Sequence, residues 1–349
     1  MVRLIKNLGW EHFFKRSKFS WHHKNKSKCG LGARHLVHFS LSTSIRLFQT
    51  EQMLNKHVGS LFLAVTVFFI SRQLCSASDI PASPDSPVSV QHIVRKEPNF
   101  SIYLVKIDLS DPRVSAHVSR GGSDPDGDGP WLTTLLPTSE IAAREHYDIA
   151  INGDFFVAEA TVDIEGKKTG YIKGKSARPE GMAMTEGQLW HRPAKTAPYL
   201  EITSNNIAKL DVGGPNSSVD PAARQIVGGG QIIERNHQAV VYTNKFAVIR
   251  NPRTVVGIAK NGTQLVLLVV DGRQPKLSIG MTLSELADEM VRAGCDDAIN
   301  LDGGGSTTLV YRDPTSHQLQ ILNSPSDGKE RSVADILGVS VNAPLPEVK

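Results

Sequence analysis

The chain has 349 residues and a formal net charge of +4, with 40% hydrophobic and 21% charged residues. This length and hydrophobic content allow a large buried core and exclude a chain that is disordered throughout. The positive charge is concentrated in residues 1–52, which carry +8, whereas residues 78–349 carry −6. The main part of the chain is therefore mildly acidic, which argues against a nucleic-acid-binding protein.

The N-terminal region is predicted to be a leader and not part of the fold. Residues 1–52 are basic and lack a core pattern, so we interpret them as a misannotated start or a disordered leader, with a basic nucleic-acid-binding tail as the alternative. Residues 53–77 have a signal-peptide layout, with an apolar segment at 61–70 and small residues up to Ala77. Ten apolar residues are too few to span a bilayer comfortably. We therefore expect a periplasmic or secreted protein without a stable membrane span.

The rest of the chain is predicted to contain a linker at 78–93 and one large domain at 94–345. Signal-peptide cleavage is expected after Ala77, which leaves Cys295 as the one cysteine of the mature chain, so no intramolecular disulfide is predicted. Strand-like segments outnumber helical ones in the domain. We expect an α+β fold with mixed β-sheets and flanking helices, and the sequence does not indicate an oligomeric state.

An acidic loop resembles the first half of a calcium-binding loop. Asp124, Asp126 and Asp128 alternate with other residues, but Leu135 occupies the position where a bidentate glutamate is needed. We expect a solvated surface loop, with weak calcium binding as the alternative, and no other metal or cofactor.

The next polar cluster follows an amphipathic segment at 139–147 and an apolar strand at 149–151. Asn152 and Asp154 share one face of the extended chain, and Phe155 and Phe156 after them could wall a sugar site or belong to the core. Further along, the glycines at 228–230 lack the context of a nucleotide-binding loop, which leaves them as candidates for lining the same cleft.

A strand, helix and strand then follow in order. The apolar run at 265–270 ends in Asp271, Thr282 and Glu285 form a capping box for a helix that ends near Gly294, and residues 298–301 form the next strand. We interpret this as a βαβ unit, whose parallel strands bring their C-terminal ends to one edge of the sheet. Asp271 and Asp302 should therefore lie near each other.

Asp302 is followed directly by Gly303, Gly304 and Gly305. Because glycine has no side chain, a ligand could approach the main chain closely beside this carboxylate. The alternative is a tight turn in which Asp302 only binds its own loop.

Five segments, in their order and spacing, are similar to the phosphodiester glycosidase family, and the resemblance covers residues 94–341. The matching segments are Asn152 to Phe156, Asn251 to Thr254 with Gly257, Asp271 to Arg273, Asn300 to Ser306, and Arg331 to Val333. The resemblance implies hydrolysis of a sugar-1-phosphate diester, which releases the sugar from a phosphate that stays on another group. The expected substrate is a glycan or glycosyl phosphate of the cell envelope or an exopolysaccharide, with no nucleic acid as a partner.

Glycosidic cleavage commonly uses two carboxyl groups, and arginines bind phosphate with a bidentate fork. We assign Asp302 as the essential carboxylate and Asp271 as the second, while Asp154, where family members carry a small residue, is not expected to be catalytic. The predicted substrate-binding residues are Arg253, Arg273, Arg331, Asn152, Asp154, Thr254, Gly303, Gly304 and Ser306. The alternatives are a carbohydrate-binding envelope protein without turnover and a phosphodiesterase that breaks the P–O bond.

Overall fold

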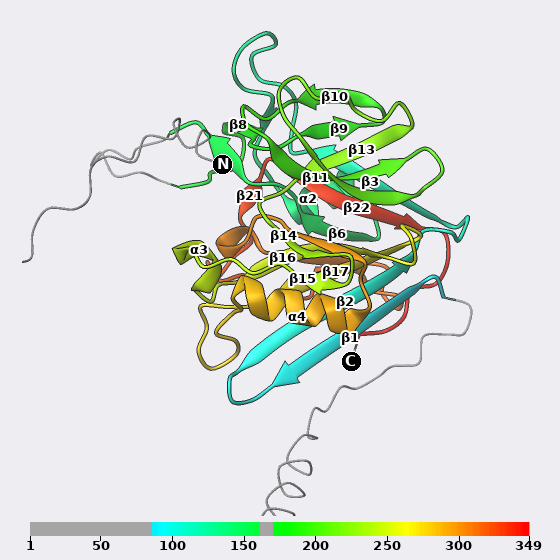
Figure 1. Cartoon of the computed structure of the whole chain (residues 1–349), viewed down its shortest axis with the longest axis vertical. Coiled ribbons are helices and arrows are strands. Elements are labelled where there is room, and N and C mark those ends of the chain that lie inside the picture. The colour runs from blue at the N-terminus through cyan, green and yellow to red at the C-terminus, as the bar shows by residue number, and fades with distance from the viewer. Residues whose placement is uncertain (1–85, 161–169, 349) are drawn as a thin grey trace, which may run out of the picture. The chain divides into compact units, whose positions relative to one another are not determined.

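The computed structural model describes residues 86–160 and 170–348 (Figure 1). The predicted leader, the signal peptide and the first half of the linker, residues 78–85, lie outside the described residues. Residues 88–93, which the sequence analysis places in the linker, instead belong to the first strand, β1. No helix of the described residues is long and apolar enough to cross a bilayer.

The largest sheet has seven strands, and every neighbouring pair in it is antiparallel. The two central strands are buried on both faces, which explains their nearly continuous apolar sequences. In spatial order the strands are β1 (Val88–Arg95), β2 (Phe100–Asp108), β17 (Gln264–Val270), β16 (Arg253–Ala259), β18 (Asp297–Asn300), β14 (Ile232–Arg235) and β15 (Gln238–Ala239).

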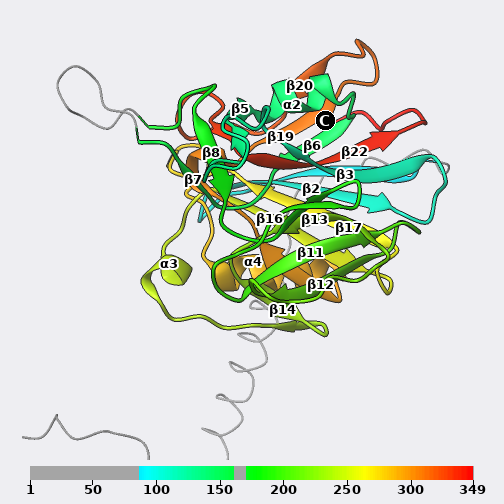
Figure 2. The same cartoon turned by 90° about the horizontal axis from the view of Figure 1, so that it is seen from above.

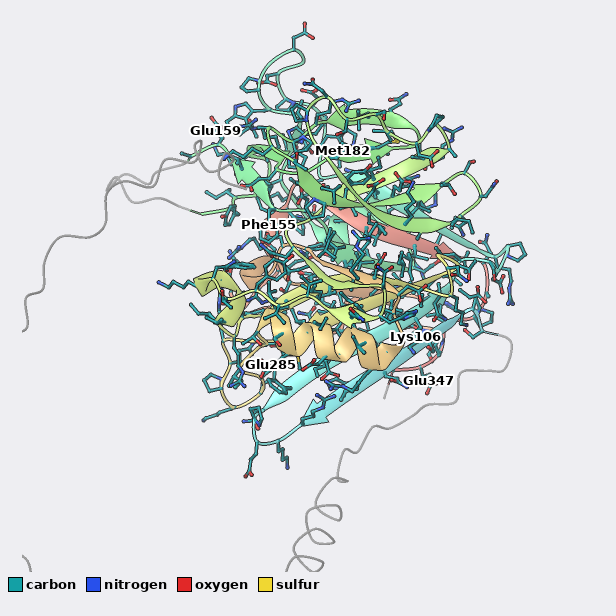
Figure 3. The ribbon with its side chains drawn as sticks, viewed as in Figure 1. Lys106, Phe155, Glu159, Met182, Glu285 and Glu347 are labelled. Atoms are coloured by element: carbon teal, nitrogen blue, oxygen red, sulfur yellow. The ribbon has the colours of Figure 1, made fainter. Side chains whose placement is uncertain are left out.

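Helix α4, Leu283–Ala293, covers one face of this sheet (Figure 1). The predicted capping box of Thr282 and Glu285 is formed, and Gly294 ends the helix in the left-handed conformation with φ 84°. Lys106 on β2 donates to the carbonyl of Ala293, where a cation is favourable; Figure 3 labels Lys106 and Glu285 toward the two ends of the helix.

Two five-stranded antiparallel sheets share a hydrophobic core with the opposite face of the seven-stranded sheet. One is ordered β10 (Gln188–His191), β9 (Ala183–Thr185), β13 (Ala223–Gly228), β11 (Ala197–Thr203), β12 (Ala208–Gly213). The other is ordered β20 (Leu319–Ile321), β19 (Leu309–Arg312), β6 (Ile149–Asn152), β22 (Asp335–Val341), β3 (Val114–Arg120). Figure 2 shows β6, β19 and β22 running together as one layer.

Short elements complete the fold around the ends of these sheets. They are β21 (Ser332–Val333) with β5 (Leu136–Pro137), β4 (Thr133–Thr134) with β8 (Ser176–Pro179) and β7 (Phe156–Ala158), and the helices α2 (Thr138–Arg144), α3 (Lys245–Val248) and η1 (Gly304–Ser306).

The strand-rich α+β class is found, but its details differ from the expectation. All strand pairs in residues 86–160 and 170–348 are antiparallel, so the sheets are not mixed. β17 and β18 run in the same direction without pairing, because β16 lies between them and is antiparallel to both. β16 reaches this place through a tight hairpin at Asn261 and Gly262, so the predicted βαβ unit of adjacent parallel strands is not formed.

Candidate active site

Asp302 lies where the ends of two strands from different sheets meet. β6 ends at Asn152 and β18 ends at Asn300. The Asp302 amide donates to the carbonyl of Gly153 at 3.1 Å, and Asn152 Nδ2 donates to the carbonyl of Asp302 at 2.7 Å. These two hydrogen bonds hold the carboxylate at the junction of the sheets.

The surroundings of Asp302 raise its pKa above the ordinary value of an aspartate. Burial is the main cause that raises the pKa of Asp302 to about 6; Ser306, the amide of Gly303 and the charge of Arg331 lower this pKa, and the charge of Glu180 raises it. The Gly303 amide donates to Asp302 Oδ1 at 2.8 Å. The buried Ser306 hydroxyl, although close, makes no hydrogen bond of normal geometry. A carboxyl group that titrates near neutral pH is suited to catalysis.

The glycines after Asp302 leave space that arginine side chains occupy. A β-carbon at Gly304 would lie 3.0 Å from Nη2 of Arg273, and one at Gly305 would collide with the guanidinium of Arg331. Gly304 also has φ 61°, a conformation that favours glycine. Two arginines therefore lie against the loop of Gly303, Gly304 and Gly305, which we call the glycine loop.

Arg253 is a buried cation that forms no ion pair with a carboxylate of the described residues. Its side chain is 1% exposed, and its guanidinium donates to the carbonyls of Met281, Phe246 and Ile249 at 2.9–3.1 Å. Burial, followed by the charge of Arg273, lowers the pKa of Arg253 to about 10. Within the described ranges no ion pair compensates this charge, so an anion bound nearby would be strongly stabilised.

Arg273 and Arg331 are more accessible. The exposed Arg273 donates from Nε and Nη2 to Asn251 Oδ1 at 3.2 and 3.1 Å. The side chain of Arg331, 20% exposed, pairs with Asp327 at 2.7 Å and lies 4.6 Å above the ring of Tyr171. Both guanidinium groups can therefore meet a ligand on the glycine loop.

Both carboxylate oxygens of Asp271 accept hydrogen bonds from neighbouring residues. Ser101 Oγ donates to Oδ2 at 2.8 Å, and the Ser324 amide and Asn323 Nδ2 donate to Oδ1 at 2.7 and 3.3 Å. Burial raises the pKa of Asp271, and these hydrogen bonds and the charge of His92 lower it. The catalytic role of Asp271 stays a prediction, and this geometry favours a bracing role instead.

Asn152 and Thr254 are buried and bonded to each other. Thr254 Oγ1 donates to Asn152 Oδ1 at 2.7 Å, and the Thr308 amide donates to the same oxygen at 3.2 Å. Both side chains therefore position the Asp302 loop, and this geometry does not favour the direct substrate contacts predicted for them.

Three more carboxyl groups surround Asp302. Asp154 and Asp335 are buried, and the charge of Asp302 raises the pKa of both. Glu180 is exposed, and its amide donates to the carbonyl of Phe155 at 2.8 Å. Sequence reasoning missed Asp335 and Glu180. Asp335 could have been identified as a candidate because it is an acidic residue in an otherwise apolar strand. No sequence feature marks Glu180, which follows β8.

Aromatic rings and a second glycine cluster lie beside the site. Phe155, labelled in Figure 3, is half-buried and stands edge-on to Phe246 at 6.1 Å, and Phe156 stands edge-on to Tyr171 at 5.1 Å. A β-carbon at Gly230 would lie 2.8 Å from the Phe155 ring. This second glycine cluster therefore packs against residues next to Asp302.

The acidic loop does not join this site. Asp124 Oδ1 accepts hydrogen bonds from the amides of Asp126 and Gly127 at 3.2 and 2.9 Å. In the part of the chain that the structure describes, no group of three or more metal-ligating side chains is arranged around a common centre. Weak calcium binding stays a prediction.

Two surface cavities lie apart from Asp302. One, of about 470 Å³, is lined by residues that include Asn206 and Arg224. The other, of about 510 Å³, is lined by residues that include Arg120 and Trp190. The chemistry of the candidate site is therefore not at either cavity.

A carboxylate with a raised pKa, set beside glycines and arginines on an antiparallel β fold, is typical of a hydrolase that acts on an anionic substrate. The chain belongs to the phosphodiester glycosidase family, which matches residues 145–340.

Two curated relatives show the extent of the similarity. N-acetylglucosamine-1-phosphodiester α-N-acetylglucosaminidase from Bos taurus is 45% identical over 219 residues, which cover 58% of this chain and 40% of the relative. The SPβ prophage-derived uncharacterized protein YomE from Bacillus subtilis is 37% identical over 92 residues, 26% of this chain and 13% of the relative. The chain thus spans less than half the length of these relatives.

Solved structures show the same fold. The zebrafish N-acetylglucosamine-1-phosphodiester α-N-acetylglucosaminidase catalytic domain matches with a TM-score of 0.50 at 20% identity, covering 76% of this chain and 86% of that one. A Burkholderia pseudomallei protein described as exported matches with a TM-score of 0.53 at 16% identity, covering 69% and 74%.

Proposed function

We propose that this chain is an exported hydrolase that cleaves the glycosidic bond of a sugar-1-phosphate diester on an envelope or extracellular glycan. The observation that carries the proposal is the placement of Asp302 and three arginines around one glycine loop. The names of the bovine and zebrafish proteins support N-acetylglucosamine as the first sugar to test. Export is proposed from the signal-peptide layout of residues 53–77.

The arginines supply the phosphate half of the site. A β-carbon at Gly303 would lie 3.7 Å from Cδ of Arg253, so this third arginine also approaches the loop. Guanidinium groups bind phosphate oxygens in pairs, and the uncompensated charge of Arg253 would be offset by a bound diester. The same groups would stabilise the negative charge that grows on the phosphate as it leaves.

The carboxyl groups supply the sugar half. Asp302 would face the anomeric carbon and stabilise its positive charge, and Glu180 would be the second carboxyl group in place of Asp271. The backbone amides of these two residues donate to the carbonyls of Gly153 and Phe155, which are two residues apart in the loop after β6 and therefore at most about 7 Å apart along the chain. Water would bond to the anomeric carbon, its proton would pass to Glu180, and the C–O bond electrons would leave with the phosphate.

A Glu180→Gln variant tests the proposal. The wild-type protein should hydrolyse an N-acetylglucosamine-1-phosphate alkyl diester, and E180Q should lose about 100-fold or more in kcat, because proton transfer by a positioned side chain contributes about 10²–10⁴. The matched control is Glu347→Gln, an exposed glutamate labelled away from Phe155 in Figure 3, which should keep full activity. Binding of glycans without turnover of any diester would favour the carbohydrate-binding alternative.

A further inference from the structure

Two carboxyl groups are buried together next to Asp302. Asp154 follows β6 and is 2% exposed, and Asp335 begins β22 and is fully buried. The amide of Asp154 donates to Asp335 Oδ1 at 2.8 Å, which fixes the two residues against each other. The Asp335 carbonyl also accepts from the Gly153 amide at 3.0 Å, so the pair is tied to the residue that anchors Asp302.

Glycines from separate segments make the space for this pair. A β-carbon at Gly153 would collide with Asp335 Oδ1. β-carbons at Gly181 and Gly228 would lie 2.7 and 2.6 Å from Asp154 Oδ2. Any larger residue at these positions would displace a carboxyl group, so the three glycines are needed for the two acids to fit.

Among the residues that the structure describes, neither carboxyl group of the pair forms a salt bridge with a cation. Asp154 accepts hydrogen bonds from the amides of Phe155 and Gly181, whereas Asp335 Oδ2 is buried without a partner. The charges of Asp335 and Asp302 raise the pKa of Asp154, and the charge of Asp302 raises that of Asp335, so the strongest electrostatic neighbours of the pair are acidic.

Other titratable groups are linked to the pair only through an intervening residue, Gly181 or Asp302. His191 on β10 contacts the carbonyl of Gly181, Glu180 precedes that glycine, and Arg331 acts on Asp302. Two adjacent buried carboxyl groups without a cation cannot both be ionised at neutral pH, so the pair must retain a proton.

We propose that Asp154 and Asp335 share a proton, and that loss of this proton sets the upper pH limit for binding of the anionic substrate beside Asp302. The part that concerns substrate rests on the proposed function. The pair acts through the field it creates and not by contact with the reacting atoms, so both are positioning residues.

The order of ionisation follows from the environment of each group. Burial, with the charge of Asp302 opposing a further negative charge, raises the pKa of Asp335 to about 7 and that of Asp154 well above its ordinary value. The pKa of Asp302 is about 6, so Asp302 ionises first as the pH rises and the pair follows. Loss of the proton that Asp154 and Asp335 share places a further negative charge next to the diester, and this charge raises KM.

An Asp335→Asn variant tests the pair without any substrate. Asparagine can still accept from the Asp154 amide through Oδ1 but cannot ionise. In the wild type, the unfolded carboxyl ionises near pH 4 and the folded one near pH 7, so stability falls as the pH rises between these values. The Tm of D335N relative to wild type should therefore increase by about 5 °C or more between pH 5 and pH 8.

Controls make this result decisive. Asp211→Asn changes an aspartate whose side chain is 50% exposed and should give a Tm difference that is independent of pH. Asp154→Asn should shift Tm with pH in the same direction as D335N, which guards against poor folding of one variant. A constant Tm difference for both buried variants would overturn the shared proton.

Activity tests the second half of the proposal. With a hydrolysable diester, the alkaline limb of kcat/KM in D335N should move up by one pH unit or more, through KM and with little change in kcat. If the Tm result is as expected but the alkaline limb is unchanged, the pair holds a proton but does not set the pH limit for substrate binding. If no diester is hydrolysed, the proposed function fails while the Tm measurement still decides whether the pair holds a proton.

Discussion

An Asp302→Asn variant is expected to lose hydrolytic activity by about 10³-fold or more while it keeps the fold. Asparagine can still accept the hydrogen bond from the Gly303 amide, and residue 302 keeps its backbone amide bond to the Gly153 carbonyl and its carbonyl bond from Asn152 Nδ2. The substitution therefore removes the negative charge that we propose stabilises the anomeric carbon and leaves these hydrogen bonds in place. Initial rates with a glycosyl-1-phosphate diester measure the effect.

The stability of D302N separates loss of chemistry from loss of structure. The pKa of Asp302 is about 6 when folded and near 4 when unfolded, so its ionisation lowers stability as the pH rises between these values. The variant should consequently be as stable as wild type at pH 7, or more stable by up to about 3 kcal/mol. Substantial remaining activity in a folded D302N would contradict the assignment of Asp302.

An Arg273→Ala variant is expected to raise KM for the diester by about 10- to 100-fold. The exposed guanidinium lies against Gly304 and donates to Asn251, so its loss removes the proposed charged contact to phosphate without opening the core. Hydrogen bonds to charged groups contribute about 1.5–3 kcal/mol, which corresponds to this range of affinity. Arg273→Lys keeps the charge but loses the bidentate fork, so its KM should be intermediate.

Arg250→Ala is the matched control for Arg273→Ala. Arg250 is also partly exposed, but its guanidinium pairs with Glu285 at the start of α4. Removing it changes the net charge equally and should leave KM unchanged. Equal effects of R250A and R273A would mean that general electrostatic attraction, and not a local phosphate contact, determines binding.

Local sequence patterns predicted the elements of the fold better than their pairing. The capping box of Thr282 and Glu285 and the helix end at Gly294 depend on neighbouring residues and were found as expected. The pairing of β17 and β18 was wrong because the Asn261-Gly262 hairpin places β16 between them. That dipeptide is a strong hairpin signal, so the sequence did contain the information.

The clustering of the candidate site residues was predictable where they belong to a motif. Asp302, its glycines and the arginines at element ends were assigned from sequence, and the structure brings them together. Asp271 was paired with Asp302 from the expected topology, and its hydrogen bonds to Ser101 and Ser324 depend on segments that are distant in the chain. The pairing of Asp154 with Asp335, 181 residues apart, likewise follows only from three-dimensional contacts.

The position of isotope label after hydrolysis in heavy-oxygen water tests the central claim most directly. If Asp302 and the arginines cleave the bond between the anomeric carbon and the phosphate oxygen, the heavy oxygen enters the released sugar and the phosphate product stays unlabelled. Mass spectrometry of both products reads the outcome. Label in the phosphate product, with none in the sugar, would show P–O cleavage and contradict the account.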